Sequence, residues 1–130
     1  MARRKLDDRI REDFGAYKGV DFEKVRLKLG ERPDGTPVEF EFDLVSPDRK
    51  IIGVIKTNRL HLSTRPKKAY GSIYSVLGAI LYLHKYPAAK ERYVILSDKE
   101  MYEEVVNRLG DIYKDIEIFF WGDLKNKKIS

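Results

Sequence analysis

Two neighbouring stretches of this sequence constrain its fold most strongly, because they read as adjacent β-strands. Apolar and acidic residues alternate over residues 38–45, so the two faces of that strand should differ. The expected inner face carries Val38, Phe40, Phe42 and Leu44, and the expected outer face carries Glu39, Glu41 and Asp43. Turn-forming residues at 46–49 lead into a second, apolar strand over residues 50–57, which ends near Lys56. We therefore expect a hairpin that presents a row of carboxylates with a lysine aimed at the same place.

The rest of the chain adds helices and strands on both sides of this hairpin. Leu6, Ile10 and Phe14 are four residues apart, which predicts a helix over residues 5–14 that ends at Gly15. Similar patterns predict strands over residues 25–29, 92–96 and 116–121, a helix over residues 66–86, and a helix from the capping-box sequence at residues 97–100 to Leu109. The order is α-β-β-β-α-β-α-β, an α/β fold in which helices flank a mixed sheet whose late strands run parallel. No linker or repeat interrupts this order, so residues 1–130 are expected to form a single domain.

The composition excludes several classes of site and favours one location. The chain has no cysteine, which excludes disulfides and thiolate metal sites and fits a reducing cytoplasm. No apolar run approaches the roughly 20 residues that span a bilayer, so no membrane partner is expected. The charged first residues favour cytoplasmic localisation over secretion. The net charge of +5 favours anionic partners such as nucleic acid, and the high content of Lys, Arg and Glu suits a thermophile.

The hairpin carries a resemblance to a known group of enzymes. The sequence Glu-Phe-Asp-Leu-Val at residues 41–45, then a turn and Ile-Ile-Gly-Val-Ile-Lys at residues 51–56, resembles the active-site hairpin of the PD-(D/E)XK nuclease superfamily. The predicted order of elements is also the core order of this restriction-endonuclease-like superfamily, so the resemblance covers nearly the whole chain. It implies hydrolysis of DNA or RNA phosphodiesters that requires Mg²⁺ or Mn²⁺. Both ions prefer oxygen ligands such as carboxylates.

The resemblance also implies roles for individual residues. Asp43 matches the first acid of the superfamily, a direct metal ligand, and the carbonyl of Ile55 matches a backbone group that ligates the metal. Lys56 matches the lysine that serves the attacking water and the phosphate. Val54 stands where the superfamily carries its second metal-binding acid, so catalysis is expected to be impaired or lost unless another acid replaces it. The candidates for replacement are Glu41, which would share the face of Asp43, and Glu12 or Asp8 of the first helix.

Basic and aromatic residues that follow the hairpin are candidates for binding a nucleic-acid backbone. Phosphate contacts of this kind do not depend on base sequence, and aromatic rings can stack on unpaired bases. The candidates are Arg59, Arg65, Lys67, Lys68 and Tyr70, with Tyr74 one helical turn later. The expected partner is therefore nucleic acid, DNA before RNA, and analogy with nuclease-like folds of this size adds the expectation of a homodimer.

Other interpretations fit the same residues. Alternating Glu and Phe is typical of any sheet with one solvent-exposed face. In that case Lys56 would simply be the end of a strand that reaches solvent. The element order also fits a thioredoxin-like fold, which lacks its Cys-x-x-Cys here, or an RNase-H-like sheet, which needs more widely separated acids. For function, the alternative to a metal-dependent nuclease is a non-catalytic module of the same fold that binds nucleic acid or a protein. A structural subunit without a nucleic-acid role is a third option.

Overall fold

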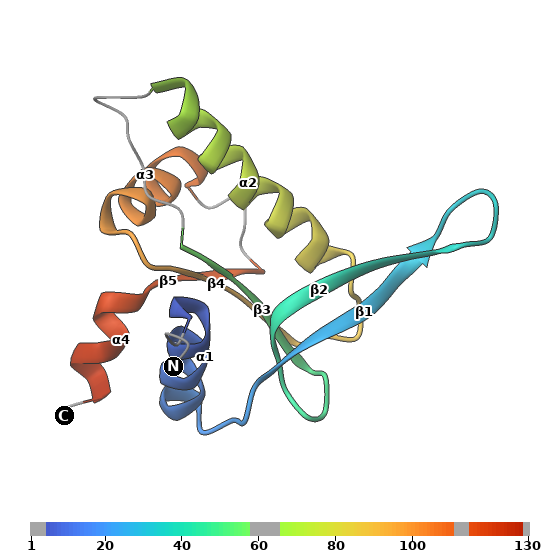
Figure 1. The fold of residues 1–130 in the computed structure, drawn as a ribbon, viewed down its shortest axis with the longest axis horizontal. Coiled ribbons are helices and arrows are strands. Elements are labelled where there is room, and N and C mark those ends of the chain that lie inside the picture. Colours follow the sequence, from blue (N-terminus) through green and yellow to red (C-terminus); the bar gives the residue numbers. More distant parts are fainter. Residues whose placement is uncertain (1–4, 58–65, 111–114, 129–130) are drawn as a thin grey trace.

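A five-stranded mixed sheet forms the centre of the computed structural model, which describes residues 5–57, 66–110 and 115–128 (Figure 1). The strands are β1 (Glu23–Glu31), β2 (Pro37–Val45), β3 (Ile51–Lys56), β4 (Glu91–Leu96) and β5 (Glu117–Phe120), and the helices are α1 (Leu6–Lys18), α2 (Pro66–His84), α3 (Lys99–Leu109) and α4 (Trp121–Lys128). The strands lie side by side in sequence order. The first three are antiparallel, whereas β3, β4 and β5 run parallel. The expected α/β class, with helices flanking a mixed sheet, is confirmed.

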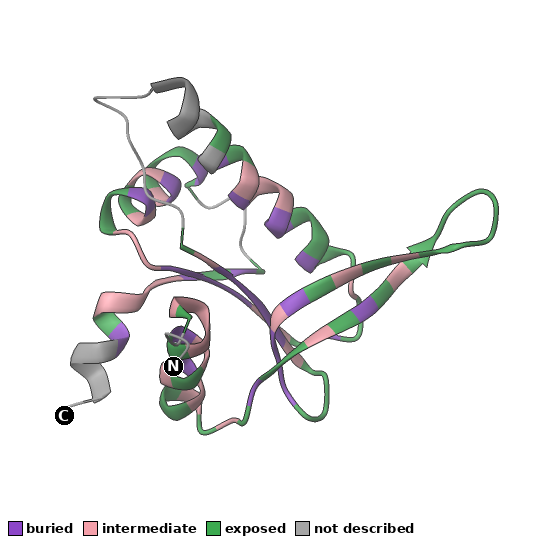
Figure 2. Cartoon of the chain, viewed as in Figure 1, coloured by how far each residue is buried: buried purple, intermediate pink, exposed green. Residues whose placement is uncertain are grey.

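Helices cover both faces of the sheet, with α2 and α3 on one face and α1 and α4 on the other (Figure 1). Successive residues of β3 alternate between these faces: Val54 packs in the core under α2 and α3, and Ile55 packs in the core under α1. Figure 2 shows the buried residues of the central strands between the two layers of helices. Among the residues that the structure describes, no helix is long and apolar enough to cross a membrane.

Helix α1 runs past the glycine that the sequence predicted as its end. The helix continues through Gly15 to Lys18 and is capped by Gly19, which adopts a left-handed backbone conformation with φ of 69°. Gly15 is needed for another reason, because a Cβ at this position would lie 2.7 Å from the carbonyl oxygen of Val20. The additional turn brings the Lys18 ammonium within 2.9 Å of the Glu91 carboxylate at the start of β4.

A β-bulge interrupts the alternation that was predicted for β2. Val25 of β1 pairs with Phe42, but Glu23 pairs with Val45, so two steps along β1 match three steps along β2. As a result, Leu44 does not share the face of Phe42 and packs instead in the core under α1. The prediction that Leu44 continues the inner face is therefore wrong. Because Leu44 and Val45 are both apolar, the order of apolar and polar residues does not reveal the extra residue of the bulge.

The last strand is shorter than predicted because a helix begins inside the predicted strand. Strand β5 ends at Phe120, and Trp121 is the first residue of α4. The indole N–H of Trp121 donates a hydrogen bond to the Asp13 carboxylate of α1 at 2.7 Å. Leu124, one turn later, is buried in the core under α1. These contacts dock the start of α4 against α1, over residues that carry no helical signal in the sequence.

Candidate functional site

Asp43 lies in the bulge of β2, at the point where this strand separates from β3. The β2–β3 ladder includes the pair Leu44–Gly53, and the Asp43 side chain extends the contact beyond it. One carboxylate oxygen of Asp43, Oδ2, accepts a hydrogen bond from the backbone N–H of Ile55 at 2.8 Å. The carboxylate therefore acts as a substitute for a backbone acceptor between the two strands.

Arg11 of α1 binds the same part of β2. Its Nε donates a hydrogen bond to the backbone carbonyl of Asp43 at 2.7 Å. Its Nη1 lies 2.7 Å from the Asp8 carboxylate, and its Nη2 lies 3.9 Å from the Asp7 carboxylate. The three residues share one face of α1 because they are three and four positions apart. Only 14% of the Arg11 side chain is exposed, so a largely buried guanidinium lies among the acids of α1 and the bulge.

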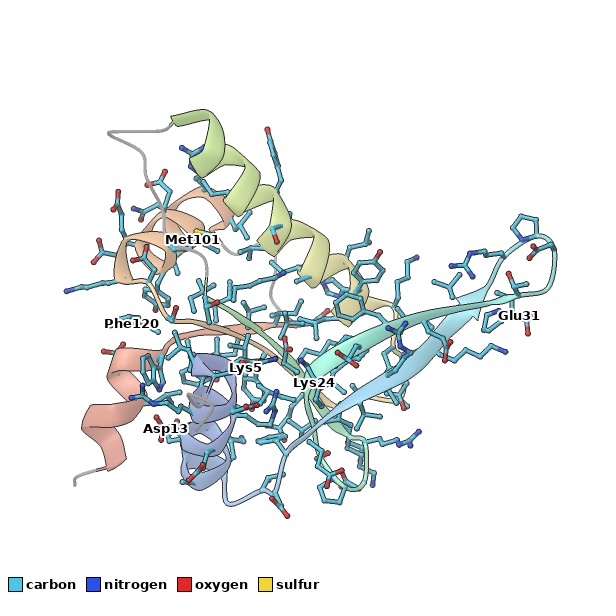
Figure 3. The ribbon with its side chains drawn as sticks, in the orientation of Figure 1. Lys5, Asp13, Lys24, Glu31, Met101 and Phe120 are labelled. Atoms are coloured by element: carbon cyan, nitrogen blue, oxygen red, sulfur yellow. The ribbon has the colours of Figure 1, made fainter. Side chains whose placement is uncertain are left out.

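Lys24 of β1 adds a second cation to this group of acids. Its Nζ lies 3.8 Å from the Asp7 carboxylate and 3.7 Å from the Glu41 carboxylate. Figure 3 shows Lys24 beside α1, where β1 and β2 leave the body of the sheet. Glu41 is thus on the α1 side with Asp43, as the alternation of the strand predicted, but it is exposed and paired with a lysine. We call Asp7, Asp8, Arg11, Lys24, Glu41 and Asp43 the α1–β2 charge cluster.

The pKa of Asp43 is raised above its ordinary value, and burial is the main cause. The hydrogen bond from the Ile55 N–H and the charges of Lys24 and Arg11 act in the opposite direction, whereas the carboxylate of Asp7 raises the pKa further. Desolvation therefore outweighs the two nearby cations. Burial in the sheet therefore makes the ionised form of Asp43 less favourable than it is in water.

Lys56 points to the opposite face of the sheet. Its Nζ donates a hydrogen bond to the hydroxyl of Ser75 in α2 at 3.0 Å. Val54 faces the same side, and only 2% of it is exposed in the core under α2. The structure therefore does not bring Lys56 to the acids: the acids interact with α1 and β1, and the lysine interacts with α2. The position that the superfamily reserves for a second acid is filled by core packing.

The residues expected to bind a metal lie on α1, β2 and β3. Within residues 5–57, 66–110 and 115–128, no group of three or more Asp, Glu, His or Cys side chains could hold a metal ion. Asp43 is bonded to the Ile55 N–H, and Glu41 is paired with Lys24. Glu12 is exposed on α1, where it lines a hollow of about 650 Å³ with Asp8, Arg11 and the segment after the helix. The described residues do not fit a Mg²⁺ or Mn²⁺ site.

The residues that the sequence proposed for nucleic-acid contact fall mostly outside the described side chains. Arg59 and Arg65 lie outside the described residues. Lys67, Lys68 and Tyr70 belong to α2, but their side chains are not among those described. Tyr74 is described, and 67% of it is exposed.

Sequence reasoning missed two side chains, Arg11 and Ser75, that contact Asp43 and Lys56. Arg11 follows Asp7 and Asp8 at helical spacing, which could have predicted the local ion pairs but not the bond to Asp43. No local signal in the sequence links Ser75 to Lys56, 19 positions earlier. A search of protein-family models, curated proteins and solved structures finds no match to this chain.

Proposed function

We propose that this chain is a nuclease-like α/β domain that binds the sugar–phosphate backbone of nucleic acid without a divalent metal and without cleaving it. The restriction-endonuclease-like arrangement belongs to the proposal. It is supported by a helix followed by three antiparallel strands and by parallel strands connected through α2 and α3. Of the three functions that the sequence left open, this is the one that the side chains favour.

The observation that carries the proposal is the hydrogen bond between Lys56 and Ser75. Lys56 ends β3, and the carboxyl ends of parallel strands are where open α/β sheets bind their ligands. The ammonium has three N–H donors and uses one of them on the Ser75 hydroxyl. The Ser75 hydroxyl accepts this hydrogen bond, and its O–H group can still donate a hydrogen bond to a ligand. The pair can therefore direct several donors and one positive charge at a phosphate oxygen, which is what binding of a nucleic-acid backbone requires.

The charge around this pair supports the same conclusion. Residues 66–84, which form α2, include no Asp or Glu, so no acid of this helix opposes an anionic ligand. In the sequence, Arg59 and Arg65 separate Lys56 from the helix, and Lys67 and Lys68 are among its first residues. Such contacts neutralise phosphates and release counterions, which makes binding depend on salt and not on base sequence.

Three observations oppose a hydrolytic reaction. The Asp43 carboxylate is bonded within the sheet, and Arg11 and Lys24 supply positive charge beside it. The carboxylates lie on the opposite face of the sheet from Lys56. Val54 is a buried core residue under α2. Binding without cleavage requires none of these groups to move.

The test is a binding titration by fluorescence anisotropy with labelled DNA and RNA, in EDTA or in Mg²⁺, over a series of salt concentrations. We expect equal binding with and without Mg²⁺ and no cleavage products. The logarithm of the binding constant should fall linearly with the logarithm of the salt concentration. Lys56→Ala should weaken binding to every sequence and should reduce the salt slope by about 1. Lys85→Ala is the matched control, because this exposed lysine follows the other end of α2 and should contribute little.

Two results would overturn the proposal. Cleavage that needs Mg²⁺ or Mn²⁺ and disappears in Asp43→Ala would restore the metal-dependent nuclease. Absence of binding at low salt would leave a domain without a role in nucleic-acid binding.

A further inference from the structure

Tyr74 is an exposed aromatic residue that directly precedes Ser75, part of the proposed phosphate contact. Its exposed fraction of 67% is larger than that of the other exposed large apolar or aromatic side chains, Tyr17, Leu81 and Tyr82. Tyr74 directly precedes Ser75, which binds the Lys56 ammonium. One residue along a helix is a rotation of about 100°, so the ring leaves α2 to one side of the Lys56–Ser75 pair. The ring and the proposed phosphate contact therefore start from consecutive residues of α2 and point in directions about 100° apart around its axis.

Two glycines leave space around this ring. Gly71 and Gly78 are three positions before and four positions after Tyr74, so all three share one face of α2. A Cβ at either glycine would meet no atom of the described residues within 4 Å, apart from neighbouring helix backbone. Packing among those residues therefore does not require glycine at these positions. A glycine inside a helix costs about 1 kcal/mol relative to alanine, so two of them on one face call for another reason.

The side-chain direction in a helix supplies that reason. Helical side chains lean toward the N-terminus and lie over the residues three and four positions earlier. Gly71 is at this place for Tyr74, and a side chain there would lie next to the ring. Among the described residues, Gly71 and Gly78 place no side chain beside the ring, so a flat ligand group can approach it past these two positions. Tyr82 contrasts with this, because its ring is already stacked on Phe40 at 4.3 Å between centroids.

We propose that Tyr74 is a stacking platform for an unpaired base and that the preferred ligand of this surface is single-stranded nucleic acid. The inference rests on the proposed function, since Lys56 and Ser75 would hold the phosphate whose base reaches Tyr74. Every base has a face that can stack, so this contact favours single strands without selecting a sequence. In a duplex the base faces are already stacked on one another, so the ring gains no such contact. The absence of acids from α2 makes its charge complementary to this ligand.

The experiment compares three labelled ligands of equal length by fluorescence anisotropy: a mixed-sequence single strand, its duplex, and a single strand in which abasic sites replace the bases. Wild-type protein should bind the normal single strand most tightly. Tyr74→Ala should weaken that binding on the order of 10-fold and should bring it close to that of the abasic strand. Tyr74→Phe should retain the affinity, because it keeps the ring. Tyr82→Ala is the control, since it removes a tyrosine of the same helix that already has a stacking partner.

The outcomes separate this inference from the function on which it rests. Tyr74→Ala leaves the protein's charge unchanged, so the salt slope should stay constant, whereas Lys56→Ala should lower it by about 1. If all three ligands bind equally and Tyr74→Ala has no effect, the stacking inference is wrong and backbone binding stands. If none of the ligands binds, both proposals are wrong.

Discussion

The Asp43 carboxylate accepts the backbone N–H of Ile55 at 2.8 Å, so an acidic side chain closes the gap between β2 and β3. The gap exists because the bulge turns β2 away from the ladder that it forms with β3. The residue that the sequence identified as the first metal ligand therefore has a structural role that needs only an acceptor oxygen. An amide side chain offers the same acceptor without the charge.

Asp43→Asn should be more stable than the wild type at neutral pH and should lose this advantage in acid. Because burial raises the pKa of Asp43 in the folded state, the folded protein binds more protons than the unfolded chain between the two pKa values. The stability of the wild type therefore falls as the pH rises through this interval, and Asn removes that loss. The measurement is the difference in free energy of unfolding between the two proteins, from urea titrations across the acid range. A difference that does not change with pH would contradict the assigned pKa shift.

Val54→Glu tests whether a restored acid could rebuild a metal site. Val54 is 2% exposed in the core under α2, so the new carboxylate would be buried among apolar side chains. We expect a loss of about 3–5 kcal/mol in the free energy of unfolding and no cleavage of DNA or RNA with Mg²⁺ or Mn²⁺. Val54→Ala is the control for lost packing and should cost about 2 kcal/mol. A stable Glu variant that cleaves with Mg²⁺ would show that this position faces the acids after all.

The sequence predicted the features of the fold that depend on local pattern. Alternation located β2 and placed Phe40 and Phe42 on one inner face, and the apolar run before Lys56 located β3. The pattern failed at Leu44, where the bulge adds a residue between two apolar positions. A register shift of this kind changes which face a side chain occupies without changing the order of apolar and polar residues.

The candidate site was harder to predict because its contacts join distant parts of the chain. The bond from Arg11 to Asp43 spans 32 positions, and the bond from Lys56 to Ser75 spans 19. Alternation in β3 shows that Val54 and Lys56 share a face, but it does not show which helix covers that face. The sequence placed the acids and the lysine together because adjacent strands bring them close. The structure separates them because the sheet has two faces and a different helix binds each group.

Asp98→Ala should destabilise the protein through the start of α3. The sequence placed a capping box at residues 97–100, and the structure assigns the cap to Asp98, whose side chain accepts the Met101 N–H at 3.0 Å. Loss of an N-terminal cap costs about 1 kcal/mol, which thermal or urea unfolding can resolve. Ser97→Ala is the matched control and should cost less, because Ser97 precedes the cap. Equal losses in the two variants would argue against Asp98 as the capping residue.

Gly53→Ala should destabilise the centre of the sheet, because β3 passes close to both of its neighbours at this position. A Cβ on Gly53 would lie 2.8 Å from Leu44 Cδ1 and 3.0 Å from the backbone oxygen of Tyr93. The leucine can move, but the carbonyl of β4 is fixed by the parallel ladder. We expect a loss of about 1–3 kcal/mol in the free energy of unfolding. Gly30→Ala in β1 is the control: its Cβ would meet no atom of the described residues within 4 Å, so alanine should be neutral or slightly stabilising. If Gly53→Ala is as stable as Gly30→Ala, then β3 and β4 are not packed as closely as this register requires.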